Sequence, residues 1–499
     1  MLTRFLVLLA LIGVSSVAAA EVGRARTNVL FIIADDLNTD LGCYGHPQVK
    51  SPNIDRLAQR GVRFEHAYCQ YPVCGPSRSS FLLGLRPNVT RILANIGRNA
   101  AGVYGTSPNT RETQPDAVTL PQLFRQNGSW TGRIGKIFHY GVPGQIGTPG
   151  LDDPFSWDVV VNPLGRDKKE EASVFSLRMD VPIAERFGGT VSWKQMDGSE
   201  LEQTDGIGAT EAIKLLETHR DRPFFLAVGF FRPHTPYVAT KKYYDLYPRD
   251  QIPLPALPAH HIEDGPVAAF ASLSPEEKKM TDTQRREAIQ GYHAAVSMVD
   301  AQVGRLLDAL DRLGLADNTV VVFTSDHGYH LGEHGLWQKN TLWENAARVP
   351  LIIAVPGSRY KGETARGLVE MLDLYPTLAD LVGLTAPANL QGLSLRPILQ
   401  DPKATVKSAA FSQVLRGGYS GYAVRTERFR YTEWDGGRSG VQLFDLEADP
   451  GELKNLATDP AQAANVAELK ALIAKNWPPG IWTPESEKGG ADKGKGGKK

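Results

Sequence analysis

Cysteine is scarce in this sequence. Its 499 residues include three cysteines, Cys43, Cys69 and Cys74. An odd number cannot pair completely within one chain, so at least one thiol stays free or is chemically altered. If Cys74 serves a function, Cys43 and Cys69 can pair with each other, but two buried thiols are an equal alternative. Pairing of all three cysteines within the chain is therefore excluded. A disulfide between Cys43 and Cys69 and two buried thiols both stay open.

The chain also carries no formal net charge. Lys and Arg together number 55, as do Asp and Glu, so the formal net charge at pH 7 is zero. Bulk attraction to the phosphates of nucleic acid needs an excess of positive charge. We therefore expect no nucleic-acid partner. The composition is otherwise that of an ordinary globular protein, and the length allows more than one domain.

Long apolar runs are absent except at the N-terminus. Residues 1–4 form a short start made basic by Arg4, residues 5–14 are almost wholly apolar, and residues 15–20 are small. These are the three parts of a secretory signal peptide, which predicts cleavage near Ala20 and export to the periplasm or the cell exterior. The apolar part is short for a membrane span, so we expect no stable membrane insertion. An uncleaved anchor is the alternative.

Four shorter apolar runs are rich in β-branched and aromatic residues, at 28–34, 223–231, 319–325 and 349–355. Such runs are typical of parallel-sheet strands that are buried on both faces. Helical patterns occupy other stretches, namely 51–61, 120–128, 209–220, 275–313 (expected in two parts) and 370–384, where Pro376 should kink the helix or delay its start. We predict an α/β fold with a mostly parallel central sheet sandwiched by helices.

The pattern changes near residue 404. Short runs at 409–414, 422–426, 429–434 and 441–445 predict antiparallel strands, and 461–476 predicts a closing helix. We therefore expect a catalytic α/β domain at 21–400, a smaller C-terminal α+β subdomain with an antiparallel sheet at 401–480, and a disordered Lys/Gly-rich tail at 481–499. Residues 88–118 predict a long surface loop, and residues 141–205 show no clear pattern.

Acidic residues follow two of the buried runs directly. Asp35 and Asp36 follow the first run, and Asp326 and His327 follow the third. Ends of parallel strands gather at one edge of a sheet, where α/β proteins bind ligands. Three carboxylates and one imidazole favour Ca²⁺ or, second, Mg²⁺. Zinc is the alternative metal, because His327 and the nearby His330 and His334 could supply nitrogen. A helix cap or a solvated turn is the alternative without metal.

Cys74 begins the segment Cys74-Gly75-Pro76-Ser77-Arg78. Pro76 suits the first position of a helix, and Gly84 can end that helix. Cys74 then lies near a helix N-terminus, where anions are favoured, and Arg78 can face the same point from one turn on. This arrangement suggests a site for an oxyanion. Taken alone, a buried structural thiol is the more common explanation.

Two further groups are weaker candidates. Lys136 and His139 are three residues apart and can share a helix face, although a solvated surface pair is the more common case. His234 lies between Pro233 and Pro236 at the end of the second run, so we expect a stiff and exposed side chain, or one that only braces a turn.

These motifs together resemble the type I sulfatases, and most closely the iduronate-2-sulfatase branch. The segment from Cys74 to Arg78 matches the family's Cys-x-Pro-Ser-Arg signature. The resemblance extends over residues 27–460 and includes further blocks: 34–36, 42–45, 51–55, 135–136, 224–229 with 233–234, 324–328 and 332–339. It implies the alkaline-phosphatase fold, with a large α/β domain and a small C-terminal sheet domain.

The resemblance also implies roles for single residues. Cys74 would be oxidised to formylglycine by a formylglycine-generating or anaerobic maturation enzyme, and its hydrate would be the nucleophile. Ca²⁺ would be held by Asp35, Asp36, Asp326, His327 and the hydrate at position 74. Arg78 would stabilise the hydrate. The sulfate would contact Lys136, His139, His234 and Lys339, and the two histidines would be candidates for proton transfer.

The resemblance implies a sulfated oligosaccharide or polysaccharide as substrate. Residues 88–118 and 141–205 depart from the iduronate enzyme's pattern, and such loops form the sugar subsites in this family, so the particular sugar stays open. Two other functions remain as alternatives. One is a phosphodiester or phosphonate monoester hydrolase of the same superfamily, and the other is a non-catalytic protein that binds sulfated glycans.

Overall fold

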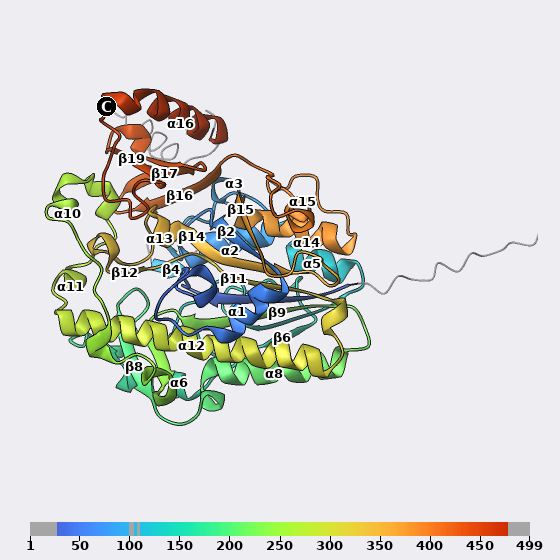
Figure 1. Cartoon of the computed structure of the whole chain (residues 1–499). Coiled ribbons are helices and arrows are strands. Elements are labelled where there is room, and N and C mark those ends of the chain that lie inside the picture. The colour runs from blue at the N-terminus through green and yellow to red at the C-terminus, as the bar shows by residue number, and fades with distance from the viewer. Residues whose placement is uncertain (1–26, 99–103, 107–109, 478–499) are drawn as a thin grey trace, which may run out of the picture.

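The computed structural model describes residues 27–98, 104–106 and 110–477 (Figure 1). The predicted signal peptide and the predicted tail lie outside these residues. At the centre is an eight-stranded sheet with the order β15-β2-β14-β11-β1-β9-β5-β6. Its strands are β1 (Asn28–Asp35), β2 (Val62–Tyr68), β5 (Trp130–Gly135), β6 (Val159–Val161), β9 (Phe224–Pro233), β11 (Thr319–Ser325), β14 (Arg348–Ala354) and β15 (Glu363–Glu370).

The mostly parallel sheet predicted from the apolar runs is confirmed. Strand β1 pairs in parallel with β11 and β9, and β9 pairs in parallel with β5. Strand β14 alone runs antiparallel to both of its neighbours, β11 and β2. Every residue of β1, β9 and β11 is buried, as expected for strands covered on both faces.

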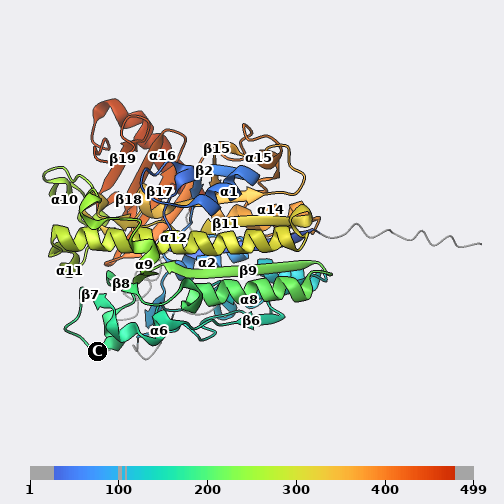
Figure 2. The ribbon, with the colours of Figure 1, turned by 60° about the horizontal axis from the view of Figure 1, so that its bottom comes forward.

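Helices cover both faces of the sheet. Leu30 and Ile32 of β1 pack on the face covered by α1 (Pro52–Arg60), α8 (Thr204–His219) and α12 (Asp282–Arg312). The alternate residues Phe31 and Ile33 pack on the other face, under α2 (Cys74–Leu83), α5 (Leu120–Gln126), α14 (Leu374–Val382) and α15 (Arg396–Gln400). Figure 2 shows the two long helices α8 and α12 running along one side. In the described part of the chain, no helix has both the length and the apolarity that a membrane crossing requires.

Several expectations need refinement. The pattern at 275–313 divides, as expected, into α11 (Pro275–Lys278) and α12. Glu370 ends β15 rather than starting a helix, and α14 begins at Leu374, so Pro376 lies in its first turn, where no intrahelical N–H is needed. Cys43 and Cys69 are both free thiols, so the pairing alternative is not realised.

The segment 88–118 is more structured than the expected surface loop. It contains most of α3 (Pro87–Thr90), the hairpin β3 (Ile96–Arg98) with β4 (Tyr104–Thr106), and α4 (Thr110–Thr113). The segment without a clear pattern holds α6 (Arg166–Lys169), β7 (Phe175–Ser176), α7 (Ile183–Arg186) and β8 (Ser192–Met196). Strand β8 pairs with β7 and with β10 (Tyr237–Thr240) in a small separate sheet. The remaining short elements are β12 (His330–Leu331), β13 (Trp337–Gln338), α9 (Lys241–Tyr244), α10 (His261–Asp264) and α13 (Glu344–Ala347).

The C-terminal antiparallel sheet is also present. Its strands, in spatial order, are β16 (Ala410–Arg416), β17 (Tyr419–Arg425), β18 (Phe429–Trp434) and β19 (Val441–Asp445). Helix α16 (Ala463–Asn476) packs on this sheet through Leu469 and Ile473. Figure 1 shows these elements gathered at one end of the large sheet.

A buried ion-pair network joins the two sheets. Glu370 at the end of β15 accepts two hydrogen bonds from Arg86, at 2.8 and 2.9 Å, and one from Lys407 at 2.8 Å. It also accepts the backbone N–H of Phe411 in β16 at 3.0 Å. Burial would raise the pKa of Glu370, but Arg86 and Lys407 more than offset this and lower it. Glu370 is therefore ionised and holds three chain segments together.

We predict that Glu370→Gln destabilises the fold by about 3–5 kcal/mol, because it leaves buried cations without their counter-charge. The measurement is denaturant unfolding of both proteins at pH 7, with the exposed Glu363→Gln on the same strand as control.

The pH dependence follows from the lowered pKa of Glu370. The stabilisation by ionised Glu370 is fully present above pH 4.5, the ordinary pKa of a glutamate. It is lost as the pH falls through the lower pKa that Glu370 has in the folded state. The stability gap between the native protein and Glu370→Gln should therefore narrow below pH 4.5. A gap that stays constant from pH 7 to pH 3 contradicts this account.

Candidate active site

The ends of β1 and β11 bring the predicted carboxylates together. The two strands pair in register, with Ala34 opposite Ser325, so the residues that follow are neighbours. Asp35 still belongs to β1, but Asp36 has a positive φ of 66°, which turns the chain out of the strand. This turn lets two successive carboxylates lie at one site, and the backbone N–H of Asp36 donates to Asp326 Oδ1 at 3.1 Å.

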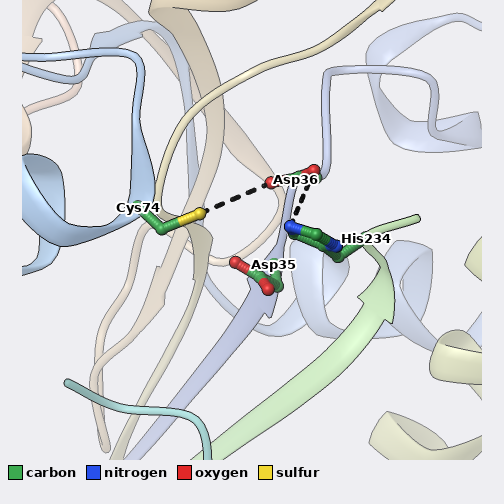
Figure 3. A group of neighbouring side chains, drawn as sticks. All are labelled: Asp35, Asp36, Cys74 and His234. Carbon is green, nitrogen blue, oxygen red and sulfur yellow. Dashed lines mark hydrogen bonds and ion pairs between the residues drawn. The ribbon is translucent and has the colours of Figure 1, made fainter. Parts of the chain in front are cut away.

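Cys74 lies at the N-terminus of a helix, as predicted, but it is the first residue of α2 rather than a residue just before the helix. Gly84 ends that helix with the predicted left-handed conformation. Pro76 is the third helical residue rather than the first, which is tolerated because no N–H in the first turn has an intrahelical partner. The thiol is fully buried, and Sγ lies 3.3 Å from His327 Nε2. Its distance to Asp36 Oδ1 is 3.8 Å (Figure 3).

Arg78 connects this helix to both strand ends. Its Nε donates to Asp326 Oδ2 at 2.8 Å and its Nη2 to Asp35 Oδ1 at 3.1 Å. Its Nη1 donates to the carbonyl of Lys136 at 2.5 Å. All four residues of this group are fully buried. Because unpaired buried charges are strongly unfavourable, each charge here depends on the others.

Two lysines complete the positive side of the site. Lys136 Nζ lies 2.6 Å from Asp35 Oδ2. Lys339 Nζ contacts Asp36 Oδ1 and lies 3.3 Å from Cys74 Sγ. Burial would raise the pKa of the Cys74 thiol, but Lys136 and Lys339 more than offset this and hold it well below the ordinary value. The position of Sγ therefore favours an anionic group.

His234 differs from its expected exposure. Its side chain is buried, with 4% of the residue exposed, because it turns inward over Asp36 instead of pointing to solvent. Its Nδ1 lies 2.5 Å from the carbonyl of Thr235 and must carry a hydrogen there. The other ring nitrogen, Nε2, then faces Asp36 Oδ2 at 3.7 Å (Figure 3).

His139 and Lys136 do not share a helix face, since both follow β5 in irregular chain. The structure nevertheless brings both to the site. Burial is the main cause that lowers the pKa of His139 to about 4, although a hydrogen bond with Cys74 raises it. Its Nδ1 is buried and has no hydrogen-bond partner among the described residues.

The donor set fits a metal ion. Ligand atoms of Asp35, Asp36, Cys74 and His234 lie within 4.8 Å of one another, as do those of Cys74, Asp326 and His327. Asp36 Oδ2 is buried without a hydrogen-bond partner among the described residues, which leaves it free for a cation. His327 Nδ1 donates to the carbonyl of Gly328 at 2.9 Å, so its Nε2 can offer a lone pair.

The nitrogen ligands that a zinc site would have recruited lie elsewhere. His330 Nε2 hydrogen bonds to Thr341 Oγ1 at 2.8 Å, and His334 stacks on Trp343 with ring centroids 4.0 Å apart. The set at the strand ends is thus dominated by oxygen, which suits a hard cation such as Ca²⁺.

A second group of possible ligands, Asp40, His46 and His293, does not fit a metal as well. His46 Nδ1 accepts the backbone N–H groups of Gln48 and Val49 at 3.3 and 3.1 Å. A neutral His46 therefore carries its hydrogen on Nε2, and neither ring nitrogen is free for a metal.

A cleft of about 720 Å³ opens over the Cys74 site. Its wall includes His139, His234 and Lys339. The wall also includes residues without any sequence signal, among them Asn340 and, from the C-terminal sheet, Arg416. Ser77 was not expected to contribute either, but its hydroxyl donates to the Asp326 carbonyl and ties α2 to the end of β11.

Family models and related proteins agree with this arrangement. The Sulfatase model matches residues 27–384, and the model of the N-sulphoglucosamine sulphohydrolase C-terminal region matches residues 332–477. A sulfatase of Formosa agariphila is 32% identical over 484 residues, covering 92% of this chain and 88% of that protein. Iduronate 2-sulfatase of Homo sapiens is 33% identical over 528 residues, covering 88% and 90%.

Solved structures share the fold. One is described as bound to its substrate, D-glucosamine-2-N,6-O-disulfate; it superposes with a TM-score of 0.68 at 23% identity, covering 90% of this chain and 97% of the other. A phosphonate monoester hydrolase of Agrobacterium radiobacter gives a TM-score of 0.72 at 25% identity, covering 90% and 95%. The fold is therefore alkaline-phosphatase-like. Together with the family models, these matches show that the chain belongs to the sulfatase family and is a sulfuric ester hydrolase.

Proposed function

We propose that this chain hydrolyses sulfate esters of a sulfated saccharide, through a formylglycine made from Cys74 and with one bound Ca²⁺. The observation that carries the proposal is the surroundings of Cys74 Sγ. This atom lies at a helix start between a lysine and an imidazole, beside three buried carboxylates. In the matured protein, the hydrated aldehyde would stand where the thiol stands here.

An unmodified thiol is poorly suited as the nucleophile of sulfate-ester hydrolysis. Transfer of a sulfuryl group to sulfur would give a stable adduct, whereas a hydrated aldehyde supplies one hydroxyl for attack and a second through which sulfate can leave. Conversion of Cys74 requires a maturation enzyme, either formylglycine-generating or anaerobic, as a partner during synthesis.

Asp35, Asp36, Asp326 and His327 would hold the Ca²⁺ together with the oxygen at position 74. When bound, the ion would neutralise negative charge on the ester. Mg²⁺ fits less well, because it demands near-ideal octahedral geometry and keeps its water.

The remaining side chains would handle the sulfate and the protons. Lys136 and Lys339 place positive charge where the anionic ester must approach. His139 interacts with Cys74, and burial lowers its pKa, so it is suited to accept a proton from the nucleophile. His234 lines the cleft, with Nε2 near Asp36 Oδ2, and is suited to donate a proton to the leaving alcohol. Arg78 keeps α2 in place, so that position 74 stays aligned.

The names of relatives support a saccharide substrate. They include the iduronate 2-sulfatases, an N-acetylglucosamine-6-O-sulfatase of Bacteroides thetaiotaomicron and an ulvan-active sulfatase of Formosa agariphila. We also propose export after cleavage near Ala20, a catalytic domain at 21–400 and a C-terminal subdomain at 401–480. The family match favours sulfate esters over the phosphodiester or phosphonate alternative.

The formylglycine proposal predicts that Cys74→Ala lowers sulfate release from an aryl sulfate by roughly 1,000-fold or more, because the nucleophile is lost. Protein made together with a maturation enzyme should carry an aldehyde at position 74 by peptide mass. Cys43→Ala is the matched control and should retain activity. An active protein whose Cys74 is a plain thiol would refute the proposal.

The metal proposal predicts that chelation lowers both activity and thermal stability. Ca²⁺ at about 100 times its Kd should restore roughly 2.7 kcal/mol of stability, since it binds only the folded state. Thermal unfolding with Ca²⁺, Mg²⁺ or Zn²⁺ measures this independently of turnover. Asp326→Asn should abolish most of the Ca²⁺-dependent rise in the unfolding temperature. If Ca²⁺ raises the unfolding temperature equally in the native protein and in Asp326→Asn, the ion binds elsewhere.

The proton-transfer roles predict a difference between the histidines. His234→Ala should slow the release of sulfate from a sugar alcohol by roughly 100- to 10,000-fold, but should affect a nitrophenyl sulfate far less, because nitrophenolate leaves without a proton. His139→Ala should slow both substrates similarly. The measurement is the steady-state kcat of each variant on the sugar sulfate and on the nitrophenyl sulfate. If His139→Ala, rather than His234→Ala, slows only the sugar sulfate, the two roles are exchanged.

A further inference from the structure

The C-terminal sheet is anchored to the segment that leads into Cys74. Ser412 Oγ of β16 donates to the carbonyl of Cys69 at 2.5 Å, and Gln413 N donates to the carbonyl of Gln70 at 2.9 Å. Two residues later, Leu415 N donates to the hydroxyl of Tyr71 at 2.6 Å. The end of β16 is therefore held at a fixed place relative to residue 74.

Arg416 is the next residue and the last of β16. It lines the same cleft as His139, His234 and Lys339. Its side chain is exposed, and its guanidinium makes no hydrogen bond or ion pair with any described residue. Among the described residues of the cleft wall, Arg416 and Lys339 are the two with a permanent positive charge, and Lys339 is already engaged with Asp36 and Cys74.

Glu277, the acidic residue of the wall, interacts electrostatically with Arg416. Burial raises the pKa of Glu277 and the charge of Arg416 partly offsets this, but the two form no ion pair in the described structure. Glu277 Oε1 accepts from Gln338 Nε2 at 2.6 Å, and its Oε2 accepts from Ser274 N at 3.0 Å. Two other polar atoms of the wall, Asn340 Oδ1 and Ser272 Oγ, are buried and make no hydrogen bond in the described structure. Hydroxyl groups of a sugar can supply those hydrogen bonds.

We propose that Arg416 binds a second anionic group of the saccharide, a carboxylate or a further sulfate, while the scissile sulfate lies at Cys74. This inference rests on the proposed function and narrows its substrate class to saccharides with two negative groups. The planar guanidinium presents parallel N–H donors that match either oxyanion. Arg416 would thus determine specificity without taking part in the chemistry.

The test uses the full chain made without maturation, so that ligands bind but are not consumed. Equilibrium binding is measured for two ligand pairs that differ by one negative charge. The first pair is glucosamine 2-N,6-O-disulfate and N-acetylglucosamine 6-sulfate. The second is a 2-sulfated uronic acid methyl glycoside and its methyl ester. The two pairs distinguish a second sulfate from a carboxylate.

We expect the native chain to bind the dianionic member of one pair roughly 10- to 100-fold more tightly, and Arg416→Ala to lose this preference. Arg416→Lys should retain part of it, since it keeps the charge without the fork. Arg438→Ala, an exposed arginine in the same sheet domain that does not line the cleft, is the control and should keep the preference.

Two results would overturn the inference: a preference that survives in Arg416→Ala, or no preference by the native chain in either pair. Turnover of the matured native chain is scored separately. If it releases no sulfate from any ester, the proposed function fails, while the binding comparison still decides the role of Arg416.

Discussion

The contact on which the site depends most is the pairing of one guanidinium with two carboxylates. Arg78 holds Asp35 and Asp326, and all three are fully buried. These residues come from α2, β1 and β11, so a single side chain fixes the helix that carries Cys74 against both strand ends. Without it, two carboxylates would be left close together in a water-free environment, which is strongly unfavourable. Cys74 and the proposed metal ligands therefore share one structural support.

A second set of contacts joins the cleft wall to the same helix. The last strand of the large sheet, β15, meets β16 of the C-terminal sheet through Glu370, and β16 is hydrogen bonded to the segment before Cys74. The C-terminal sheet is thus more than a structural appendage, because its first strand supplies part of the cleft wall. Changes in that sheet would alter the cleft wall without disturbing the strand ends.

The sequence allowed much of this to be predicted. The acidic residues after two apolar runs could be placed together because ends of parallel strands share one edge of a sheet. The motif around Cys74 identified the family. What could not be predicted depends on tertiary neighbours. The prolines around His234 suggested exposure, but the packing around it decides its burial. Strand β15 lacks a continuous apolar run, and Arg416 has no local signal that it reaches a cleft formed by residues far away in the chain.

The complete burial of Cys74 has a consequence for the order of events during synthesis. The proposed maturation enzyme would need access to this residue, which is completely buried in the folded chain. Asp326 follows Asp36 by 290 residues, and Lys339 comes later still. Strand β11, which lies beside β1 in the finished sheet, therefore leaves the ribosome long after Cys74 has emerged. This delay would keep the thiol accessible for a defined interval, and a chain that folds before modification would carry a thiol that the proposed maturation enzyme can no longer reach.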